Sequence, residues 1–257
     1  MSSDTSKDQT SDLGGIRVLV TGATSGLGAA MAAALTRAGA RVMVTGRDQA
    51  RAQAAADALG ASAIPWALDV RDERSVAACV AGAREAWGGI DMLVNNAGIG
   101  MRTVNPRFIS EPQPFWEVTP AGFRDVVDTK VVGCFLVARE VVGVMLADGG
   151  GRIVNISMNE QTMVRRGFVP YGPSGAAVEA LSRVMEADLA GSSVTVNILL
   201  PGGATRTGMV PDEVPAEAQA ALLDPAVMGP PIVWLASDRA AGVHGRRIVA
   251  TEFDPAG

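Results

Sequence analysis

The sequence predicts one α/β domain in which a doubly wound parallel sheet carries helices on both faces. Three observations lead to this prediction. Short apolar runs alternate with helix-length segments from residue 16 onward, the first run ends in a glycine-rich turn, and no change in composition divides the 257 residues. Strands separated by helix-length segments pair in parallel, because each crossover returns the chain to the same edge of the sheet.

The expected elements follow from apolar periodicity and from the glycines that end several helices. Apolar runs predict strands at 18–21, 41–45, 64–68, 91–94, 152–156, 194–200 and 247–250. Helices are predicted at 27–38, 49–59, 73–87, 123–146 and 173–190. The last of these begins with Pro173, which is tolerated in a first helical turn. Residues 1–13, rich in Ser, Asp and Thr, are expected to form a flexible tail before a domain at 14–257.

Two proline-rich stretches, 100–120 and 202–231, interrupt the alternation. Each follows the C-terminal end of a predicted strand, and that edge of an open α/β sheet holds the ligand crevice. Long stretches without regular structure are usually functional or disordered. We therefore expect substrate-side loops here, with ordinary surface loops as the alternative.

Composition argues against several classes of protein. Lys and Arg number 22 against 27 Asp and Glu, a net charge of −5 without a basic stripe, so nucleic acid and anionic membrane are poor partners. No apolar run approaches the ~18 residues of a membrane span. The N-terminus lacks the apolar segment of a signal peptide. Cys79 and Cys134 lack metal-ligand spacing, which favours a reduced, cytoplasmic protein without a metal site.

The turn after the first strand has the pattern of a phosphate-binding loop. Gly22 permits the tight turn, Gly26 lets the backbone approach a pyrophosphate, and Gly28 lets the helix pack on the strand. The helix N-terminus then presents free N–H groups to phosphate. A merely structural turn is the alternative. The strand-turn-helix context favours a Rossmann-type dinucleotide site, with cofactor contacts expected from Thr21, Gly22, Thr24, Ser25, Gly26, Leu27 and Gly28.

Further motifs resemble the short-chain dehydrogenase/reductase family in its TGxxxGxG form, over nearly all of 14–257. The run 95–98 is similar to the family's NNAG, and the run from Pro201 to Thr207 to its PG…T segment. Asp69 stands where the family has an acid near the adenine. The resemblance implies a small-molecule substrate and a homodimer or homotetramer built on the long helices. It also implies cofactor contacts from Asp69, Val70, Asn95, Ala97, Gly98, Pro201, Gly202 and Thr207.

The end of the second strand bears on the choice of cofactor. A carboxylate there binds the ribose 2′-OH of NAD, whereas an arginine accommodates the 2′-phosphate of NADP. Gly46 stands at the position of the family's acid, and Arg47 follows with a planar fork suited to phosphate. We therefore expect NADP(H), bound at Arg47, while the neighbouring Asp48 keeps NAD(H) open.

The expected catalytic residues depart from the family's pattern. The resemblance makes Tyr171, the only tyrosine, the general acid/base, and a phenol of ordinary pKa ~10 needs a nearby cation for that role. The family places a lysine four residues later, where this chain has Gly175. Lys130 in turn stands at the family's asparagine on the central helix. We expect a swapped cation, with Lys130 reaching Tyr171; two unrelated changes are the alternative.

The serine of the site is expected to be Ser157. The run 155–158 resembles the family's Asn-Ile-Ser-Ser, with Met158 at the second serine position. Ser157 would polarise the substrate oxygen, or else serve only a structural role. His244, the one histidine, is expected to be structural or near the cofactor rim. Four loop arginines are expected to bind an anionic substrate or to remain solvated, namely Arg102, Arg107, Arg165 and Arg166.

These residues support three functions to different degrees. The first is an NADP(H)-dependent oxidoreductase acting on a carbonyl/alcohol pair. The second is a non-redox enzyme on the same scaffold, such as a lyase, isomerase or cyclase, in which a protonated tyrosine donates a hydrogen bond. The third is a dinucleotide-binding protein without catalysis. Loss of lysine at Gly175 favours the second and third, and the intact glycine loop favours the first and second.

Overall fold

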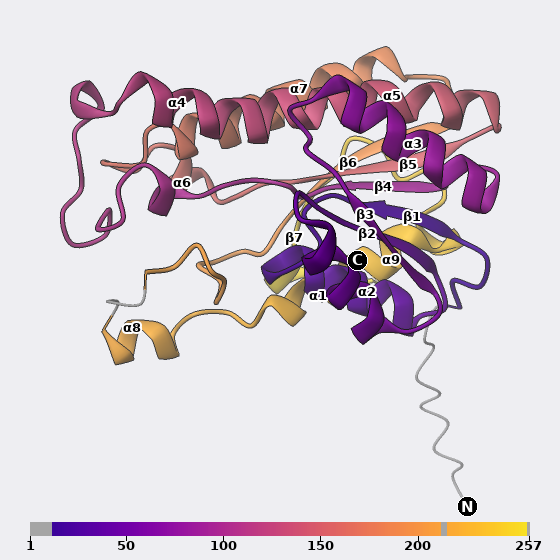
Figure 1. Ribbon diagram of the computed structural model, residues 1–257, viewed down its shortest axis with the longest axis horizontal. Helices are drawn as coiled ribbons and strands as arrows, with labels where there is room; N and C mark the ends of the chain where they lie inside the picture. Colours follow the sequence, from indigo (N-terminus) through magenta and orange to yellow (C-terminus); the bar gives the residue numbers. More distant parts are fainter. Residues whose placement is uncertain (1–11, 212–214, 256–257) are drawn as a thin grey trace, which may run out of the picture.

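The computed structural model describes residues 12–211 and 215–255 (Figure 1). In these residues, parallel strands form one seven-stranded sheet in the order β3-β2-β1-β4-β5-β6-β7. This confirms the predicted fold class, and each predicted strand is present to within one residue at either end. The strands are β1 Arg17–Val20, β2 Arg41–Gly46, β3 Ala63–Ala67, β4 Met92–Asn95, β5 Gly151–Ile156, β6 Val194–Leu200 and β7 Arg247–Val249.

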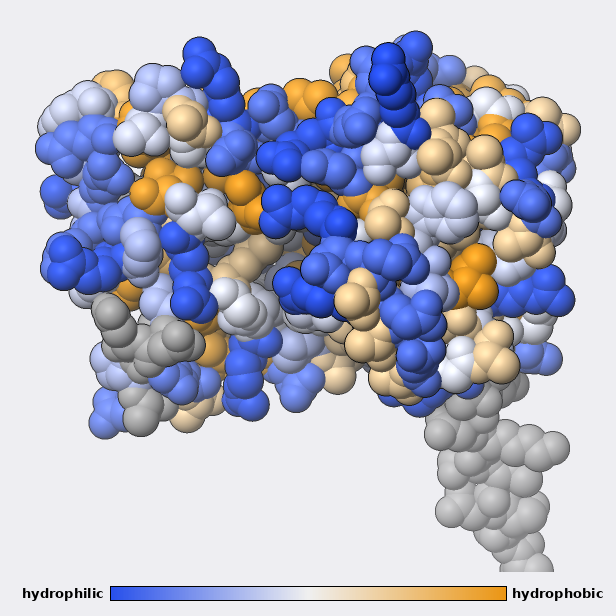
Figure 2. Space-filling view, viewed as in Figure 1, coloured by the Kyte–Doolittle hydropathy of each residue, from blue (hydrophilic) through white to orange (hydrophobic). Residues whose placement is uncertain are grey.

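Helices cover both faces of the sheet (Figure 1). On one face lie α1 (Gly26–Arg37), α2 (Gln49–Leu59) and α9 (Gly229–Ala236); on the other lie α3 (Glu73–Trp87), α5 (Gly133–Ala147) and α7 (Tyr171–Asp188). Each face has its own apolar core. Along β1, Val18 and Val20 enter one core and Leu19 the other, as alternation along a strand requires. Polar side chains cover most of the face seen in the space-filling view (Figure 2).

The helix predicted at 123–146 is divided by a π turn. The chain forms α4 (Pro120–Val127), the π turn Asp128–Val132 and then α5 without leaving the helical path. Such turns insert an extra residue and are frequent at functional sites. Lys130 lies inside the turn. Apolar periodicity did not indicate this change in helical register.

The stretch 202–231 is more ordered than predicted. It contains α8 (Ala216–Ala220), a 3-10 turn at Pro225–Met228 and the start of α9. Two of the prolines that suggested a loop, Pro230 and Pro231, stand in the first turn of α9, where no intrahelical N–H is needed, and Ile232 and Leu235 then bury the helix against the core. The loop prediction is therefore wrong for 229–231. In the stretch 100–120, short 3-10 turns form at Met101–Thr103 and Phe115–Glu117.

The predicted tail, residues 1–13, lies almost entirely outside the described residues. Its last residue does not behave as tail. Leu13 is 1% exposed, and its N–H donates to the carbonyl of Ala38 at 2.7 Å. In the described part of the chain, no helix is both long and apolar enough to cross a membrane.

Candidate active site

The glycine loop joins β1 to α1 in a conformation that requires glycine. Gly22 has φ +64°, and a Cβ there would lie 2.9 Å from the Cα of Ala97. A Cβ at Gly28 would lie 2.5 Å from the side-chain nitrogen of Asn96. The absence of a side chain at both positions therefore lets the loop lie close against the segment that follows β4.

Hydrogen bonds fix that contact. The hydroxyl of Thr21 accepts from the N–H groups of Asn96 and Ala97, both at 2.9 Å. The amide of Asn96 donates to the carbonyls of Thr21 and Gly22, both at 3.0 Å. We had not expected Asn96 to be a site residue, although it lies in the motif that drew attention to its neighbours. Its side chain shapes the loop.

Asn95, an expected cofactor contact, is hydrogen-bonded to the neighbouring strand. It is 7% exposed, and its amide donates to Oδ1 of Asn155 at 3.0 Å. The Asn155 amide in turn donates to the hydroxyl of Ser182 on α7 at 2.8 Å. Asn95 therefore ties β4 to β5 beneath the site.

The segment after β6 also reaches the glycine loop. A Cβ at Gly26 would lie 3.2 Å from the Cγ2 atom of Thr207, so these distant parts of the sequence are in contact. Gly202 has φ +96°, and its carbonyl accepts from the amide of Asn159 at 3.0 Å. The structure thus gathers the ends of β1, β4 and β6 at one edge of the sheet, as the predicted cofactor site requires.

The N-terminus of α1 fits a phosphate group. Its first turn contains no acidic residue, and the Ser25 side chain does not cap the helix. The terminal N–H groups therefore remain available to an anion in the field of the helix dipole. This chemistry, with the glycine cradle, fits a dinucleotide.

Asp69, predicted to lie near the adenine, is held by an ion pair. Asp69 pairs with Arg71 at 2.7 Å, and this hydrogen bond holds the pKa of Asp69 below its usual value. Beside it, Val70 packs against Gly133, where a Cβ would lie 2.5 Å from its Cγ2 atom. Val70 therefore joins the loop after β3 to the start of α5.

At the end of β2, an acid at position 46 would fit only if the Thr24 side chain moved. A Cβ at Gly46 would lie 2.7 Å from Cγ2 of Thr24. Arg47 is exposed. Asp48 caps α2, since its carboxylate accepts from the N–H of Arg51 at 3.0 Å. Of the two charged residues considered for cofactor choice, Asp48 thus already accepts a hydrogen bond within the protein, whereas Arg47 is exposed.

Lys130 and Tyr171 come together beyond this site. The ammonium nitrogen of Lys130 lies 5.3 Å from the centroid of the Tyr171 ring. The lysine stem passes Gly98, where a Cβ would lie 3.9 Å from its Cγ atom. Burial lowers the pKa of Lys130 to about 8 and raises the pKa of Tyr171. The expected approach of the two residues is present in the structure; its part in catalysis stays a prediction.

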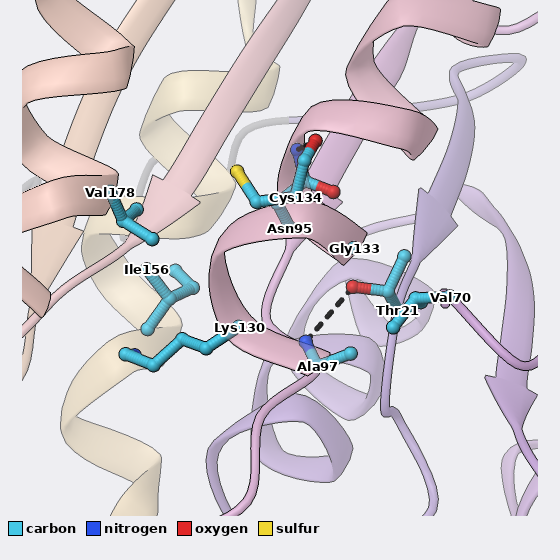
Figure 3. Close-up of a pocket in the computed structure, with 9 residues that line it drawn as sticks. All are labelled: Thr21, Val70, Asn95, Ala97, Lys130, Gly133, Cys134, Ile156 and Val178. Atoms are coloured by element: carbon cyan, nitrogen blue, oxygen red, sulfur yellow. Dashed lines mark hydrogen bonds between the residues drawn. The ribbon is translucent and has the colours of Figure 1, made fainter. Parts of the chain in front are cut away.

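A small cavity lies beside Lys130 (Figure 3). It is lined by Thr21, Val70, Asn95, Ala97, Lys130, Gly133, Cys134, Ile156 and Val178. Much of this lining is apolar, which explains why the ammonium is poorly solvated. Burial raises the pKa of the Cys134 thiol to about 12, so it stays protonated near neutral pH. Oδ1 of Asn95 is buried there without a hydrogen-bond partner among the described residues.

The Tyr171 side chain has apolar surroundings. Its ring packs against a cluster of Met101, Phe108 and Phe168. Its hydroxyl donates to the sulfur of Met209 at 3.8 Å. Met209 comes from the loop after β6, and nothing in the sequence pattern singled it out.

Ser157, expected to polarise a substrate oxygen, donates its hydroxyl to a carboxylate of the protein. Its hydroxyl donates to Glu179 on α7 at 2.6 Å, and Glu179 pairs with Arg247 at 3.0 Å. A hydroxyl that gives its proton to a carboxylate does not donate to a substrate oxygen at the same time. This arrangement favours the structural role for Ser157. Glu179 and Arg247 were not predicted.

His244, the one histidine, has structural partners on two elements. His244 accepts the N–H of Val196 at Nδ1, and its Nε2 lies 3.0 Å from the carbonyl of Glu186, so it joins β6 to α7. The described residues contain no group of three His, Cys, Asp or Glu placed to hold a metal ion.

The loop arginines also have contacts. Arg102 donates to the carbonyls of Gly208 and Val210. Arg107 pairs with Glu111 at 3.0 Å, and Arg165 lies 4.7 Å above the Phe168 ring. Arg166 is the one of the four whose side chain has no such contact with the residues that the structure describes. The loops are thus held by their own arginines.

Comparisons with known proteins agree with this geometry. The model of the short chain dehydrogenase family matches residues 17–218. Gluconate 5-dehydrogenase of Gluconobacter oxydans (strain 621H) is 35% identical over 193 residues, 74% of this chain and 72% of its own. The 3-oxoacyl-(acyl-carrier-protein) reductase of Vibrio cholerae serotype O1 is 32% identical over 244 residues, 92% of this chain and 96% of its own.

A solved structure with the same fold is that of 3-ketoacyl-(acyl-carrier-protein) reductase from Brucella melitensis, complexed with NADH. It superposes with a TM-score of 0.82 at 28% identity, covering 92% of this chain and 97% of that one. Relatives that align over most of their length are thus named as dehydrogenases or reductases. The chain belongs to the short-chain dehydrogenase family of oxidoreductases.

Proposed function

We propose that this protein is an NADP(H)-dependent oxidoreductase that interconverts a carbonyl and an alcohol. Tyr171 acts as the general acid/base, and Lys130 supplies the cation that this role requires. The observation that carries the proposal is the position of the Lys130 ammonium, 5.3 Å from the centroid of the Tyr171 ring. In a site with little water, that charge acts on the phenol at low effective dielectric.

The proton chemistry follows from the two side chains. In reduction, the hydroxyl of Tyr171 gives its proton to the substrate oxygen and becomes a phenolate. The charged Lys130 stabilises that phenolate, which offsets the burial that raises the pKa of Tyr171. When bound, the nicotinamide supplies the hydride in this direction and accepts it in the other.

The cofactor site favours NADP(H). Thr24 fills the space beside Gly46, so a carboxylate there would not fit without movement of Thr24. Asp48 is engaged in capping α2, whereas Arg47 is exposed and can pair with a 2′-phosphate. The Brucella melitensis relative was crystallised with NADH, so both cofactors belong in the test.

A non-redox function is the second candidate. It is supported by the raised pKa of Tyr171, because a partly buried phenol that stays protonated is a good hydrogen-bond donor. Such a site serves a lyase, isomerase or cyclase when the developing charge on the substrate is an oxyanion. The oxidoreductase proposal requires a cation beside Tyr171, whereas this non-redox function does not.

We also propose that the protein forms a homodimer or homotetramer through the long helices. Phe135 and Leu146 on α5 are 45% and 48% exposed, and Val184 on α7 is 56% exposed. These helices lie on the same face of the sheet (Figure 1). Light scattering on the wild type and on Phe135→Asp tests this: the variant is expected to dissociate, and a monomeric wild type would contradict it.

The enzymatic proposal is tested by a screen of aldehydes and ketones for NADPH consumption, with calorimetric titration of NADPH and NADH. Tyr171→Phe serves as the matched variant, because it removes one oxygen and keeps the ring under Lys130. The proposal expects NADPH binding by both proteins and turnover by the wild type alone. Binding without turnover across the panel would favour the non-redox function, and turnover by Tyr171→Phe would remove Tyr171 from the mechanism.

A further inference from the structure

Gly175 lies in the interior of α7, where glycine is a poor helix former. Its position has a packing reason. A Cβ at Gly175 would lie 2.7 Å from the terminal methyl carbon of Met158 and 2.9 Å from its sulfur. Real Cβ atoms do not approach other atoms so closely, so any side chain at 175 would have to displace the flexible thioether end of Met158 from the space it fills.

The backbone of Met158 is held firmly in this place. Its carbonyl accepts from the guanidinium of Arg247 at 3.1 Å. Arg247 pairs with Glu179, which also accepts from the hydroxyl of Ser157 at 2.6 Å. Glu179 stands one helical turn after Gly175. The loop after β5 is therefore anchored to α7 through Glu179.

Position 175 is also one helical turn after Tyr171, on the same side of α7. A long side chain there would run beside the phenol. Met158, 6% exposed, closes this approach with a neutral thioether. The approach from the other side remains, and Lys130 uses it, since its stem passes Gly98 and its ammonium lies over the ring.

We propose that Met158 is a positioning residue that seals the approach to Tyr171 from position 175, so that Lys130 alone serves the phenol as cation. This inference rests on the proposed oxidoreductase function for its catalytic half. Its structural half stands on the contact between Met158 and Gly175. The two halves have separate readouts.

Thermal unfolding tests the structural half in a double-mutant cycle of Gly175→Ala with Met158→Ala. In the wild-type background, Gly175→Ala should lower Tm by a few degrees, because the new methyl group displaces the packed thioether of Met158 and this outweighs the helix propensity gained. In the Met158→Ala background, it should leave Tm unchanged or raise it. Gly143→Ala is the control, because a Cβ at that glycine of α5 meets nothing within 4 Å and Tm should rise.

A second cycle tests the catalytic half. Gly175→Lys alone should leave kcat unimproved, whereas Met158→Ala with Gly175→Lys admits a second cation. In that double variant, Lys130→Met should reduce kcat by less than tenfold, against about 100-fold or more in the wild-type background. An equal loss of kcat in both backgrounds would contradict the proposal that Met158 blocks the approach to Tyr171 from position 175.

The two readouts also separate this inference from the proposed function. If Gly175→Ala raises Tm equally with and without Met158, the packing argument is wrong whatever the enzyme does. If the wild type reduces no carbonyl but the Tm cycle shows coupling, the proposed function fails and the Met158–Gly175 contact stands.

Discussion

The ammonium nitrogen of Lys130 lies 5.3 Å from the centroid of the Tyr171 ring. The two residues stand on different helical segments, the π turn after α4 and the first turn of α7. Because the lysine stem crosses apolar surroundings, its charge is held where water screens it weakly. That arrangement is the basis for proposing Lys130 as the cation that serves Tyr171, and the burial that lowers the Lys130 pKa also makes its charge unfavourable to folding.

The first prediction concerns pH. We predict that kcat for carbonyl reduction is steady below pH 8 and falls above it by up to about tenfold per pH unit. Burial lowers the pKa of Lys130 to about 8, so rising pH removes the cation that stabilises the Tyr171 phenolate. Lys130→Arg keeps its charge over this range and should lack the fall in kcat. A wild-type profile that stays flat to pH 10 would be incompatible with this role.

The second prediction concerns stability. Below pH 8 the charged Lys130 is less stable in the folded protein than in the unfolded chain, since burial lowers its pKa from 10.5 to about 8. Lys130→Met should therefore raise the free energy of unfolding at pH 7 by on the order of 2–3 kcal/mol. The gain should shrink as pH rises from 8 towards 10.5. Urea unfolding of both proteins measures it; a less stable variant at pH 7 would refute the prediction.

The third prediction concerns cofactor choice. Arg47→Ala should weaken NADPH binding by about 10- to 100-fold, as expected for loss of a charge-assisted hydrogen bond to phosphate, and leave NADH binding unchanged. Calorimetric Kd values for both cofactors measure this. Arg37→Ala, which removes an exposed charge near the end of α1, is the control and should change neither Kd. Equal weakening for NADPH and NADH would argue against a 2′-phosphate contact.

Local sequence patterns predicted the fold well because strands and glycine-ended helices are encoded by neighbouring residues. The approach of Lys130 to Tyr171 was also predictable. Tyr171 matches the family's tyrosine, whereas Lys130 stands where the family has asparagine. The π turn was not predictable, because its residues have ordinary helical composition. The partners of Ser157 and Tyr171 lie 22 and 38 residues further along the chain. Such contacts depend on packing between segments, which periodicity does not record.

The fourth prediction uses Tyr171 as its own reporter, because the chain has only one tyrosine. Met209→Ala should lower the pKa of Tyr171 towards its ordinary value, since removing the thioether admits more water to the partly buried hydroxyl. The near-ultraviolet absorbance of tyrosinate follows the titration. Met209→Leu keeps the apolar volume and should keep the pKa raised. The same titration curve for the wild type and Met209→Ala would show that Met209 does not shield the phenol.

The most direct test of the central claim is kcat for carbonyl reduction by Lys130→Met, measured below pH 8 with saturating NADPH. Because the variant is expected to be at least as stable as the wild type, loss of activity cannot be assigned to unfolding. We predict a fall in kcat of about 100-fold or more, with the Kd for NADPH changed only a few-fold. A near-normal kcat would contradict the account, because Tyr171 would then act without the charge of Lys130.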